Sequence, residues 1–283
     1  MLARLRYYRQ KLRPWQFNFA QIPRRILRGK VVHAYWYAAV PNFGDDITPA
    51  LLAHYGYTPI YAPPERSQLA ATGSILHKVP VDYRGCVLGA GFISAESAHP
   101  CPHATMLAVR GVQTRELAHA PATTPLGDPG LLLPQLLRTR PARQYQIGLV
   151  PHFVDKAHPA LAQICARYPT QVKHIDVQRD PVVVMEEIAQ CEFILSSSLH
   201  GMVVADALGI PNAWLVLSDR VLGSGFKFYD YFSAFDASFE PASLTGAETL
   251  EQLAALTHPV SPHIAALQTE LDRQFRDLAH RLR

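Results

Sequence analysis

The sequence predicts an α/β protein of two halves that face each other across a cleft, each half with its own parallel β-sheet. Short runs rich in apolar and β-branched residues alternate with helical patterns, which is typical of parallel strands joined by helices. The alternation stops at a segment rich in proline and arginine, residues 134–144, and then begins again. We therefore expect two Rossmann-like domains, at 30–141 and 142–260, joined by a linker.

Length and composition agree with a folded α/β protein. The 283 residues are 48% hydrophobic and 18% charged, which suffices for a large core and excludes a disordered chain. No apolar run is long enough to predict a transmembrane helix, and the first 15 residues lack the apolar core of a secretion signal. The four cysteines form no closely spaced pair, which argues against a disulfide scaffold or a structural zinc site. We expect a protein of the cytoplasm.

The segment 1–29 is strongly basic and amphipathic. With its neighbour Lys30 it contains nine of the 27 Lys and Arg residues and no acid, because the first carboxylate is Asp45. Apolar side chains recur every three or four positions from Leu2 to Ile26, which predicts an amphipathic helix. Such a helix can lie on an anionic membrane, where each basic residue contributes about 1 kcal/mol, or pack on the protein with a solvated basic face. We expect membrane contact, since no acid balances the charge. The acidic remainder indicates no nucleic-acid-binding face.

In the first half a helix is expected to open at Thr48-Pro49 and another to cover 112–120. The β-rich runs, which we expect to be strands, are VVHAYWYAA (31–39), ATGSIL (71–76), CVLGAG (86–91) and MLAVRG (106–111).

In the second half Asp180 is expected to cap a helix that begins at Pro181, and Gly209 to end one that covers 199–209. A further helix is expected at 157–167, and the segment 261–283 predicts a long terminal helix. The expected strands are QIGLVPHF (146–153), QVKHIDV (171–177), EFILSSS (192–198) and AWLVL (213–217). Ligands of parallel sheets bind beyond the carboxyl ends of the strands, so the residues just after the strands are candidates for a site.

The segment Ser196-Ser197-Ser198-Leu199-His200-Gly201 is the strongest candidate, because a buried strand turns into a helix there. Hydroxyls, free N–H groups and the positive end of the helix converge, which predicts an anion pocket with His200 as a proton or hydrogen-bond donor. A serine-rich cap with a structural histidine is an equal alternative. A helix N-terminus disfavours a charged imidazole, so His200 would hold its proton only near an anion.

The loop 41–46 follows the first strand and precedes a helix, so Asn42, Gly44 and Asp45 face the predicted cleft, although a turn with a capping Asp also explains them. Arg110 comes directly after the apolar residues 106–109 of its β-rich run, where a guanidinium could grip a carboxylate or phosphate.

Other features are weaker. Asp128, in Gly127-Asp128-Pro129-Gly130, could position an acid or simply form a turn. Gly89-Ala90-Gly91 lacks the third glycine of a dinucleotide fingerprint. His99, Cys101 and His103 lack a fourth zinc ligand, so we expect a loop and no metal site.

Eight short motifs follow one another along residues 42–232: NFGD (42–45), ATGSILH (71–77), GAG (89–91), AVRG (108–111), GDPGLL (127–132), VPHF (150–153), SSSLHG (196–201) and FKFYD (226–230). In this order they resemble polysaccharide pyruvyl transferases, and the xanthan-type ketal pyruvate transferases most closely. Many relatives have an arginine two positions before the histidine, where this chain has Ser198. A cation must then come from elsewhere, and Arg110, Lys227 or Arg220 are available.

The resemblance implies a fold similar to two-domain GT-B glycosyltransferases. It also implies transfer of pyruvate from phosphoenolpyruvate to a sugar of a lipid-linked exopolysaccharide repeat unit, which gives a pyruvate ketal and phosphate. Phosphoenolpyruvate is then the donor substrate, and no cofactor is expected. The expected location is the cytoplasmic face of the bacterial inner membrane, with the segment 1–29 on the anionic surface.

For this reaction His200 is expected to be the acid, and Asp45 a base or a ligand of the acceptor sugar. Substrate binding is expected from Arg110, Lys227, Ser196, Ser197, Ser198, Gly201, Asn42, Gly44, Gly73 and Ser74. The alternatives are a GT-B glycosyltransferase that uses a nucleotide sugar and a non-catalytic scaffold of polysaccharide assembly.

Overall fold

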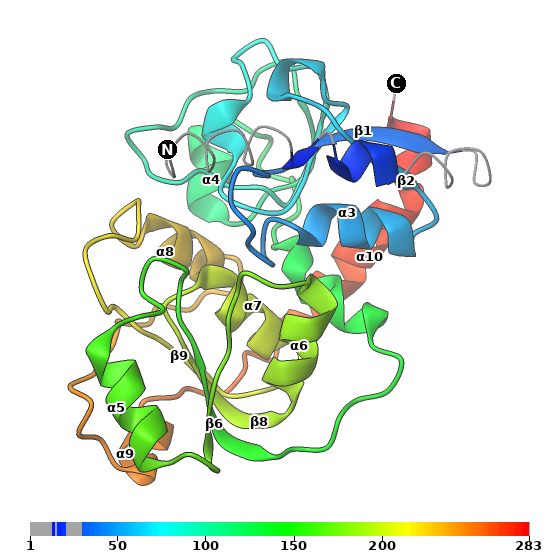
Figure 1. Cartoon of the computed structure of the whole chain (residues 1–283). Coiled ribbons are helices and arrows are strands. Elements are labelled where there is room, and N and C mark those ends of the chain that lie inside the picture. The colour runs from blue at the N-terminus through cyan, green and yellow to red at the C-terminus, as the bar shows by residue number, and fades with distance from the viewer. Residues whose placement is uncertain (1–12, 15, 21–29, 283) are drawn as a thin grey trace, which may run out of the picture.

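Runs of apolar and β-branched residues form two parallel sheets in the computed structural model, which describes residues 13, 14, 16–20 and 30–282 (Figure 1). The α/β class with parallel sheets is confirmed. The first sheet has the strand order β2-β1-β3-β4-β5, with β1 (Val31–Tyr35), β2 (Thr58–Tyr61), β3 (Leu69–Ala70), β4 (Cys86–Leu88) and β5 (Thr105–Ala108). The second has the order β7-β6-β8-β9, with β6 (Tyr145–Val150), β7 (Val172–His174), β8 (Cys191–Ser196) and β9 (Asn212–Trp214).

The helices follow the strands as expected for crossover connections. They are α3 (Ile47–His54), α4 (Val112–Leu117), α5 (Pro159–Arg167), α6 (Pro181–Ala189), α7 (Leu199–Ala207), α8 (Phe226–Ser233), α9 (Leu250–Ala255) and α10 (Ile264–Arg281). Short 3₁₀ helices lie between them: η1 (Pro64–Arg66), η2 (Leu76–Lys78) and η3 (Pro129–Leu136).

Several local predictions are confirmed by side-chain contacts. The carboxylate of Asp180 accepts hydrogen bonds from the N–H groups of Val182 and Val183, so it caps α6. Gly209 has a φ of +69°, the left-handed conformation that ends a helix. The long terminal helix is α10, whose apolar face buries Leu271, Phe275 and Leu278.

Two predictions need correction, and three elements were not predicted. The strand expected at 71–76 is wrong, because β3 ends at Ala70 and the polar residues 72–74 form a loop after it. The strand β2 and the helices α8 and α9 were not predicted. The expected linker 134–144 begins inside η3, whose apolar residues are buried, and only its later part lacks regular structure.

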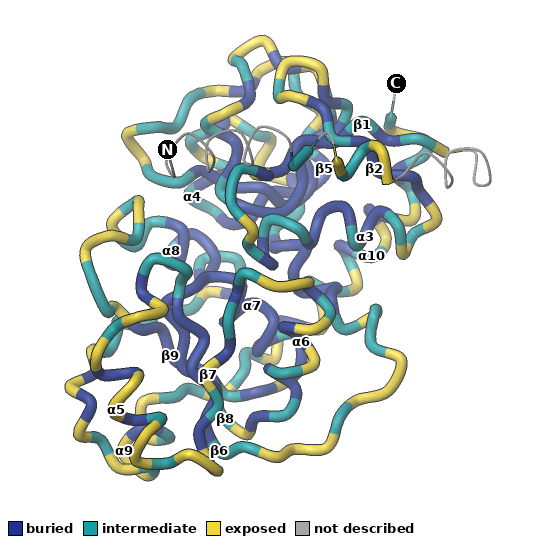
Figure 2. The backbone as a smooth tube through the Cα atoms, in the orientation of Figure 1, coloured by how far each residue is buried: buried dark blue, intermediate teal, exposed yellow. Residues whose placement is uncertain are grey.

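The two sheets share one hydrophobic core. Figure 2 shows buried backbone running from the first half, at the top, through α7 into the second half. One buried cluster joins Val32 of β1 and Leu51 of α3 to Ile194 of β8 and Val203 of α7. The terminal helix α10 returns to the first half, where its residue Asp272 accepts a hydrogen bond from Tyr55 of the loop after α3. The division into domains at 141 and 260 stays a prediction.

A short part of the basic segment is described, and it packs on the first half. Arg13 forms an ion pair with Asp46, and the Phe17 ring packs edge-on against Trp36 at 5.0 Å. Phe19, in contrast, is 71% exposed. The rest of the predicted amphipathic segment 1–29 lies outside the described residues. No described helix has both the length and the apolar character needed to cross a bilayer.

Candidate active site

A cavity of about 630 Å³ lies between the two halves, lined by loops that follow the carboxyl ends of strands in both sheets. The first sheet contributes the loops after β1, β3 and β4, and the second the loops after β6, β8 and β9. Predicted site residues meet there as expected for parallel sheets. Of these, the lining residues are Asn42, Asp45, Ser74, Ser198, His200 and Lys227.

His200 lies in the first turn of α7 and is held by segments of the first half. A Cβ at Gly44 would lie 2.0 Å from Nδ1 of His200, so the imidazole can reach this position only because residue 44 is glycine. The ring of Phe43 meets the imidazole edge-on at 6.3 Å. On the other side Nε2 of His200 lies 3.5 Å from Oδ2 of Asp128, whose side chain is fully buried. Histidine therefore sits where the two halves meet.

Asp45 faces the same cavity, and the pKa of its carboxylate lies close to neutral pH. Burial raises the pKa of Asp45 to about 6, although the charges of His200 and Lys227 and a hydrogen bond from Asn42 favour the ionised form. The Asn42 amide donates to Oδ2 of Asp45 at 2.8 Å. Gly73 lies against this carboxylate, since a Cβ there would be 3.1 Å from Oδ1. A carboxylate of this pKa can give or take a proton near pH 7.

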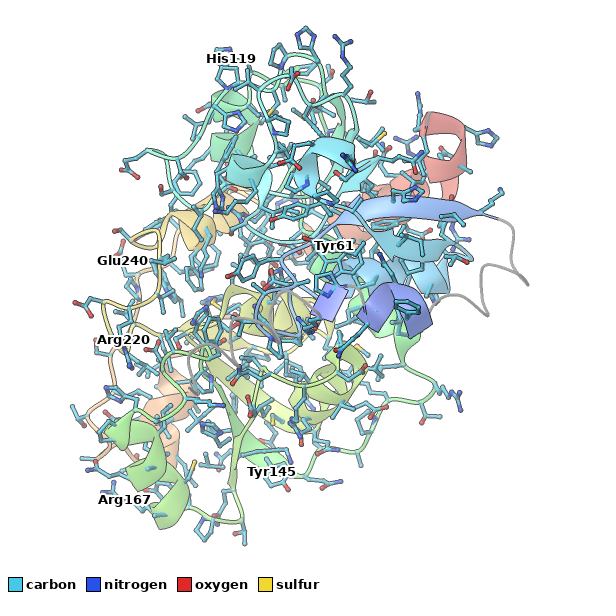
Figure 3. The ribbon with its side chains drawn as sticks, turned by 45° about the horizontal axis from the view of Figure 1, so that its top comes forward. Tyr61, His119, Tyr145, Arg167, Arg220 and Glu240 are labelled. Carbon is cyan, nitrogen blue, oxygen red and sulfur yellow. The ribbon has the colours of Figure 1, made fainter. Side chains whose placement is uncertain are left out.

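Lys227, in the first turn of α8, places a buried cation in the cavity. Its side chain is only 8% exposed. Burial and the nearby charge of Arg110 lower the pKa of Lys227 to about 8, while Asp45 and Asp155 favour the charged form. At neutral pH the ammonium group is still mostly protonated, so it can bind an anion. Arg220 also lines the cavity, and Figure 3 shows this residue at the left edge of the molecule. Its side chain is 58% exposed.

The structure corrects the expected position of Arg110. Its guanidinium is fully buried behind the cavity wall and does not project into it. Nε donates to Asp230 of α8 at 2.8 Å, and the other nitrogens donate to Ser74 Oγ and to the carbonyl of Phe92, each at 2.7 Å. A direct grip on a ligand is therefore not what this geometry provides. Arg110 instead fixes Ser74, which does line the cavity.

Some residues of the serine-rich turn 196–201 line the cavity, and the others hold the turn in shape. Ser196 accepts from the N–H of Ser198 at 3.0 Å, which shapes the strand-to-helix turn. Ser197 donates to the buried carboxylate of Asp155 at 3.1 Å. Gly201 allows α7 to pack close, because a Cβ there would lie 2.3 Å from Ser196 Oγ. Only Ser198 and His200 of the predicted residues in this turn face the cavity, so Ser196, Ser197 and Gly201 support it.

Two further histidines, which were not predicted as site residues from the sequence, also line the cavity. Burial lowers the pKa of His152 to about 4, and the charge of Lys227 adds to the effect. Burial and the charge of Lys78 lower the pKa of His77 to about 4. Both imidazoles are thus neutral at pH 7 and suited to hydrogen bonding. Their motifs, VPHF and ATGSILH, follow strands, and that position was the available signal.

Three buried carboxylates support the walls. Asp128 faces His200, and Asp230 holds Arg110 and the N–H of Thr114. Asp155 accepts from Ser197 and from Ser218 of the loop after β9, so it joins two of the loops that reach the cavity. The turn around Asp128 was visible in the sequence, but the partners of Asp155 and Asp230 lie 42 to 120 positions away and gave no local signal.

The residues His99 and Cys101 lie close together, with 3.9 Å between Nδ1 and Sγ. Within the described chain no group of three His, Cys, Asp or Glu side chains is arranged to hold a metal ion.

Comparison with known proteins finds a similarity to one family. Residues 101–219 match the family model of polysaccharide pyruvyl transferases. The chain is similar to this family over that range. The matched range contains His152, Ser198 and His200, which line the cavity, and also Arg110 and Asp128, which support it from the first half.

Two curated proteins are similar to parts of this chain. The uncharacterized protein L143 of Acanthamoeba polyphaga mimivirus is 38% identical over 114 residues, 39% of this chain and 39% of that protein. Succinoglycan biosynthesis protein ExoV of Rhizobium meliloti (strain 1021) is 26% identical over 215 residues, 73% of this chain and 66% of ExoV. The chain thus covers less than two thirds of the length of either relative.

Among solved structures, the E. coli RcsC C-terminus with its linker region and phosphoreceiver domain aligns with 89% of this chain and 96% of that chain. Its identity is 14% and its TM-score 0.24, which is too low to indicate a shared fold. The similarity to polysaccharide pyruvyl transferases therefore depends on the sequence matches.

Proposed function

We propose that this protein transfers pyruvate from phosphoenolpyruvate to a sugar of a lipid-linked exopolysaccharide repeat unit, forming a pyruvate ketal and phosphate. The similarity to the family and to a succinoglycan biosynthesis protein supports pyruvate transfer in exopolysaccharide biosynthesis. One structural observation carries the finer proposal: a single cavity is lined by a buried cation, an imidazole and a carboxylate of raised pKa. These groups belong to Lys227, His200 and Asp45.

The donor needs two anion sites, because phosphoenolpyruvate has a carboxylate and a phosphate. Lys227 provides one, as a buried ammonium whose attraction is little screened by water. The first N–H groups of α7 provide another, since the first amides of a helix have no partner within it and its N-terminus attracts anions. Ser198 leaves this helix terminus without a long side chain, so Lys227 takes the part of the cation that many relatives place at that position.

The reaction requires proton transfers that match these residues. A proton adds to the methylene carbon, a sugar hydroxyl oxygen bonds to the central carbon, and the bond from that carbon to the phosphate oxygen then breaks. A second sugar hydroxyl completes the ketal. The two hydroxyl protons balance the proton gained by the new methyl group and the proton carried away by phosphate. We assign the acid to His200 and the acceptance of a hydroxyl proton to Asp45.

The acceptor sugar fits the outer part of the cavity. Tyr37, 39% exposed, and Phe153 line it there, and aromatic rings pack against the apolar faces of sugars. The neutral imidazoles of His77 and His152 provide hydrogen bonds to hydroxyl groups without adding charge. A cavity of about 630 Å³ lies within the usual range for binding sites, roughly 300–1,000 Å³.

The location follows from the acceptor. A lipid-linked acceptor lies at the cytoplasmic face of the inner membrane, and phosphoenolpyruvate is a cytosolic metabolite. We propose that the basic segment 1–29 binds this anionic surface. Its eight Lys and Arg side chains, nine with Lys30, and the exposed ring of Phe19 support this proposal. A GT-B-type arrangement of the two sheets is part of the same proposal, and the reaction needs no cofactor.

The test is the pyruvate content of the exopolysaccharide. A strain that lacks this protein is expected to make polysaccharide without the pyruvate ketal, as measured by mass spectrometry. The wild-type gene and the control His103→Ala, an exposed histidine outside the cavity, are expected to restore it. His200→Ala is expected to lower turnover of the purified protein by roughly 10²–10⁴-fold. Full pyruvylation without the protein, or near-normal turnover by His200→Ala, would contradict the proposal.

A further inference from the structure

The environment of His200 contains a feature that the proposed reaction does not by itself require. Nε2 of His200 and Oδ2 of Asp128 are both buried, neither has a hydrogen-bond partner, and they face each other at 3.5 Å. A buried polar atom without a partner is unfavourable, so two such atoms in mutual contact indicate a shared proton. Catalytic hydrogen bonds are often long in the free enzyme and shorten when substrate binds.

The other oxygen of Asp128 fixes the direction of this carboxylate. Oδ1 accepts from the backbone N–H of Gly130 at 2.8 Å, at the start of η3. Gly130 is itself confined, since a Cβ there would lie 2.9 Å from Val203 of α7. The turn 128–130 is therefore packed against the helix that contains His200, and Oδ2 can face only the imidazole.

We infer that Asp128 is a positioning residue that keeps a proton on Nε2 of His200 and leaves Nδ1 for the substrate; this inference rests on the proposed function for its catalytic consequence. Nε2 is turned into the protein, so the ring nitrogen available to a ligand is Nδ1, which lies against Gly44. The carboxylate of Asp128 also stabilises the imidazolium at a helix N-terminus, where a positive charge is otherwise disfavoured. In the reaction the Nδ1–H proton passes to the substrate, the electron pair of that bond stays on Nδ1, and Nε2 keeps its own proton.

Asp45 is the competing anion near His200, and the two carboxylates have separate tasks. Asp45 lies on the cavity side and accepts a hydrogen bond from the Asn42 amide, whereas no hydrogen bond joins it to Nε2 of His200. Its charge acts on the imidazole as a whole. Replacing Asp45 and Asp128 one at a time shows which of the two carboxylates determines the ring nitrogen of His200 that carries the proton.

The variant Asp128→Asn keeps the shape of the side chain and reverses its hydrogen bonding. The Gly130 N–H requires an acceptor at Oδ1, so the asparagine oxygen stays there and its NH₂ group faces Nε2. A donor at this position cannot accept a proton from Nε2. We expect the neutral imidazole of the variant to carry its proton on Nδ1 instead.

The experiment is ¹⁵N NMR of the ring nitrogens in the full chain without substrate, with the His200 signals assigned by their absence in His200→Gln. The inference expects Nε2–H in the neutral form of the wild type and of the control Asp45→Asn, and Nδ1–H in Asp128→Asn. With phosphoenolpyruvate and a lipid-linked oligosaccharide as the acceptor, Asp128→Asn is expected to release phosphate on the order of 10²-fold more slowly than the wild type.

The outcomes separate this inference from the proposed function. If the neutral imidazole of His200 in the wild type carries its proton on Nδ1, the inference is overturned, even if Asp128→Asn does not fold. The inference is also overturned if Asp128→Asn folds and its His200 has the same tautomer as the wild type. Neither NMR result depends on activity. If the wild type releases no phosphate, the proposed function is contradicted. The position of the proton on His200 is then still determined by the NMR data.

Discussion

Asp45 combines a catalytic position with a cost in stability. Its carboxylate has a pKa raised to about 6, against 3.8 in an unfolded chain, and burial is the main cause. Between about pH 4 and pH 6 the unfolded chain releases this proton while the folded protein keeps it, so folding loses stability as the pH rises through this interval. Above about pH 6 the loss is complete and constant.

Asp45→Asn should therefore stabilise the protein at neutral pH. Asparagine does not titrate, and its oxygen can still accept from the Asn42 amide. The free energy of unfolding is expected to exceed that of the wild type by on the order of 1–3 kcal/mol at pH 8, with the difference vanishing below about pH 4. Urea unfolding at a series of pH values measures it. A difference that is independent of pH, or a less stable variant at pH 8, would contradict the pKa of Asp45.

The residues that sequence reasoning placed best are those whose position follows from a strand end. Asn42, Asp45, Ser198 and His200 come directly after strands or their loops, and parallel topology brings such residues to one edge. Arg110 has the same sequence signal, yet its charge is neutralised by Asp230, 120 positions later. Whether an arginine faces a ligand or a buried carboxylate depends on tertiary contacts, which the local sequence does not show.

The helix α8 joins the two halves at the cavity. Its Lys227 reaches the cavity, and its Asp230 binds Arg110 and Thr114 of the first half. Close contact requires glycine at 111, because a Cβ there would lie 1.7 Å from the carbonyl oxygen of Asp230. Sequence patterns missed this helix, since it is short and its partners lie on a different sheet. The motif FKFYD marked its position only through the family resemblance.

Asp230→Asn tests whether this helix depends on the buried ion pair. The substitution leaves the fully buried charge of Arg110 without its partner, which is expected to lower the free energy of unfolding by about 3–5 kcal/mol. The matched control is Asp277→Asn, whose partner Arg273 lies 3.7 Å away on the exposed face of α10. There a change below about 1 kcal/mol is expected. Equal stabilities of the two variants in urea unfolding would show that the buried pair does not hold α8.

The whole molecule places one cavity between two sheets that share a core. The sequence rhythm predicted both sheets, because strand and helix periods are local properties. It could not show that η3, α7 and α10 bind the halves together, since these contacts join Leu131, Val203 and Leu271 from distant parts of the chain. A shared core keeps the two walls of the cavity in a fixed relation. The anion site proposed here depends on that relation, because Asp128 and Gly44 of one half hold the histidine of the other.

The central claim is that this cavity binds a small donor with two anionic groups through Lys227. Calorimetric titration of phosphoenolpyruvate into the wild type, Lys227→Met and the control Lys156→Met, an exposed lysine outside the cavity, measures it directly. The wild type and the control are expected to bind one equivalent, and Lys227→Met to bind roughly 10- to 100-fold more weakly, as expected for the loss of a charged hydrogen bond. UDP- and GDP-sugars should give no binding. Equal affinity of Lys227→Met and the wild type, or tighter binding of a nucleotide sugar than of phosphoenolpyruvate, would contradict the claim.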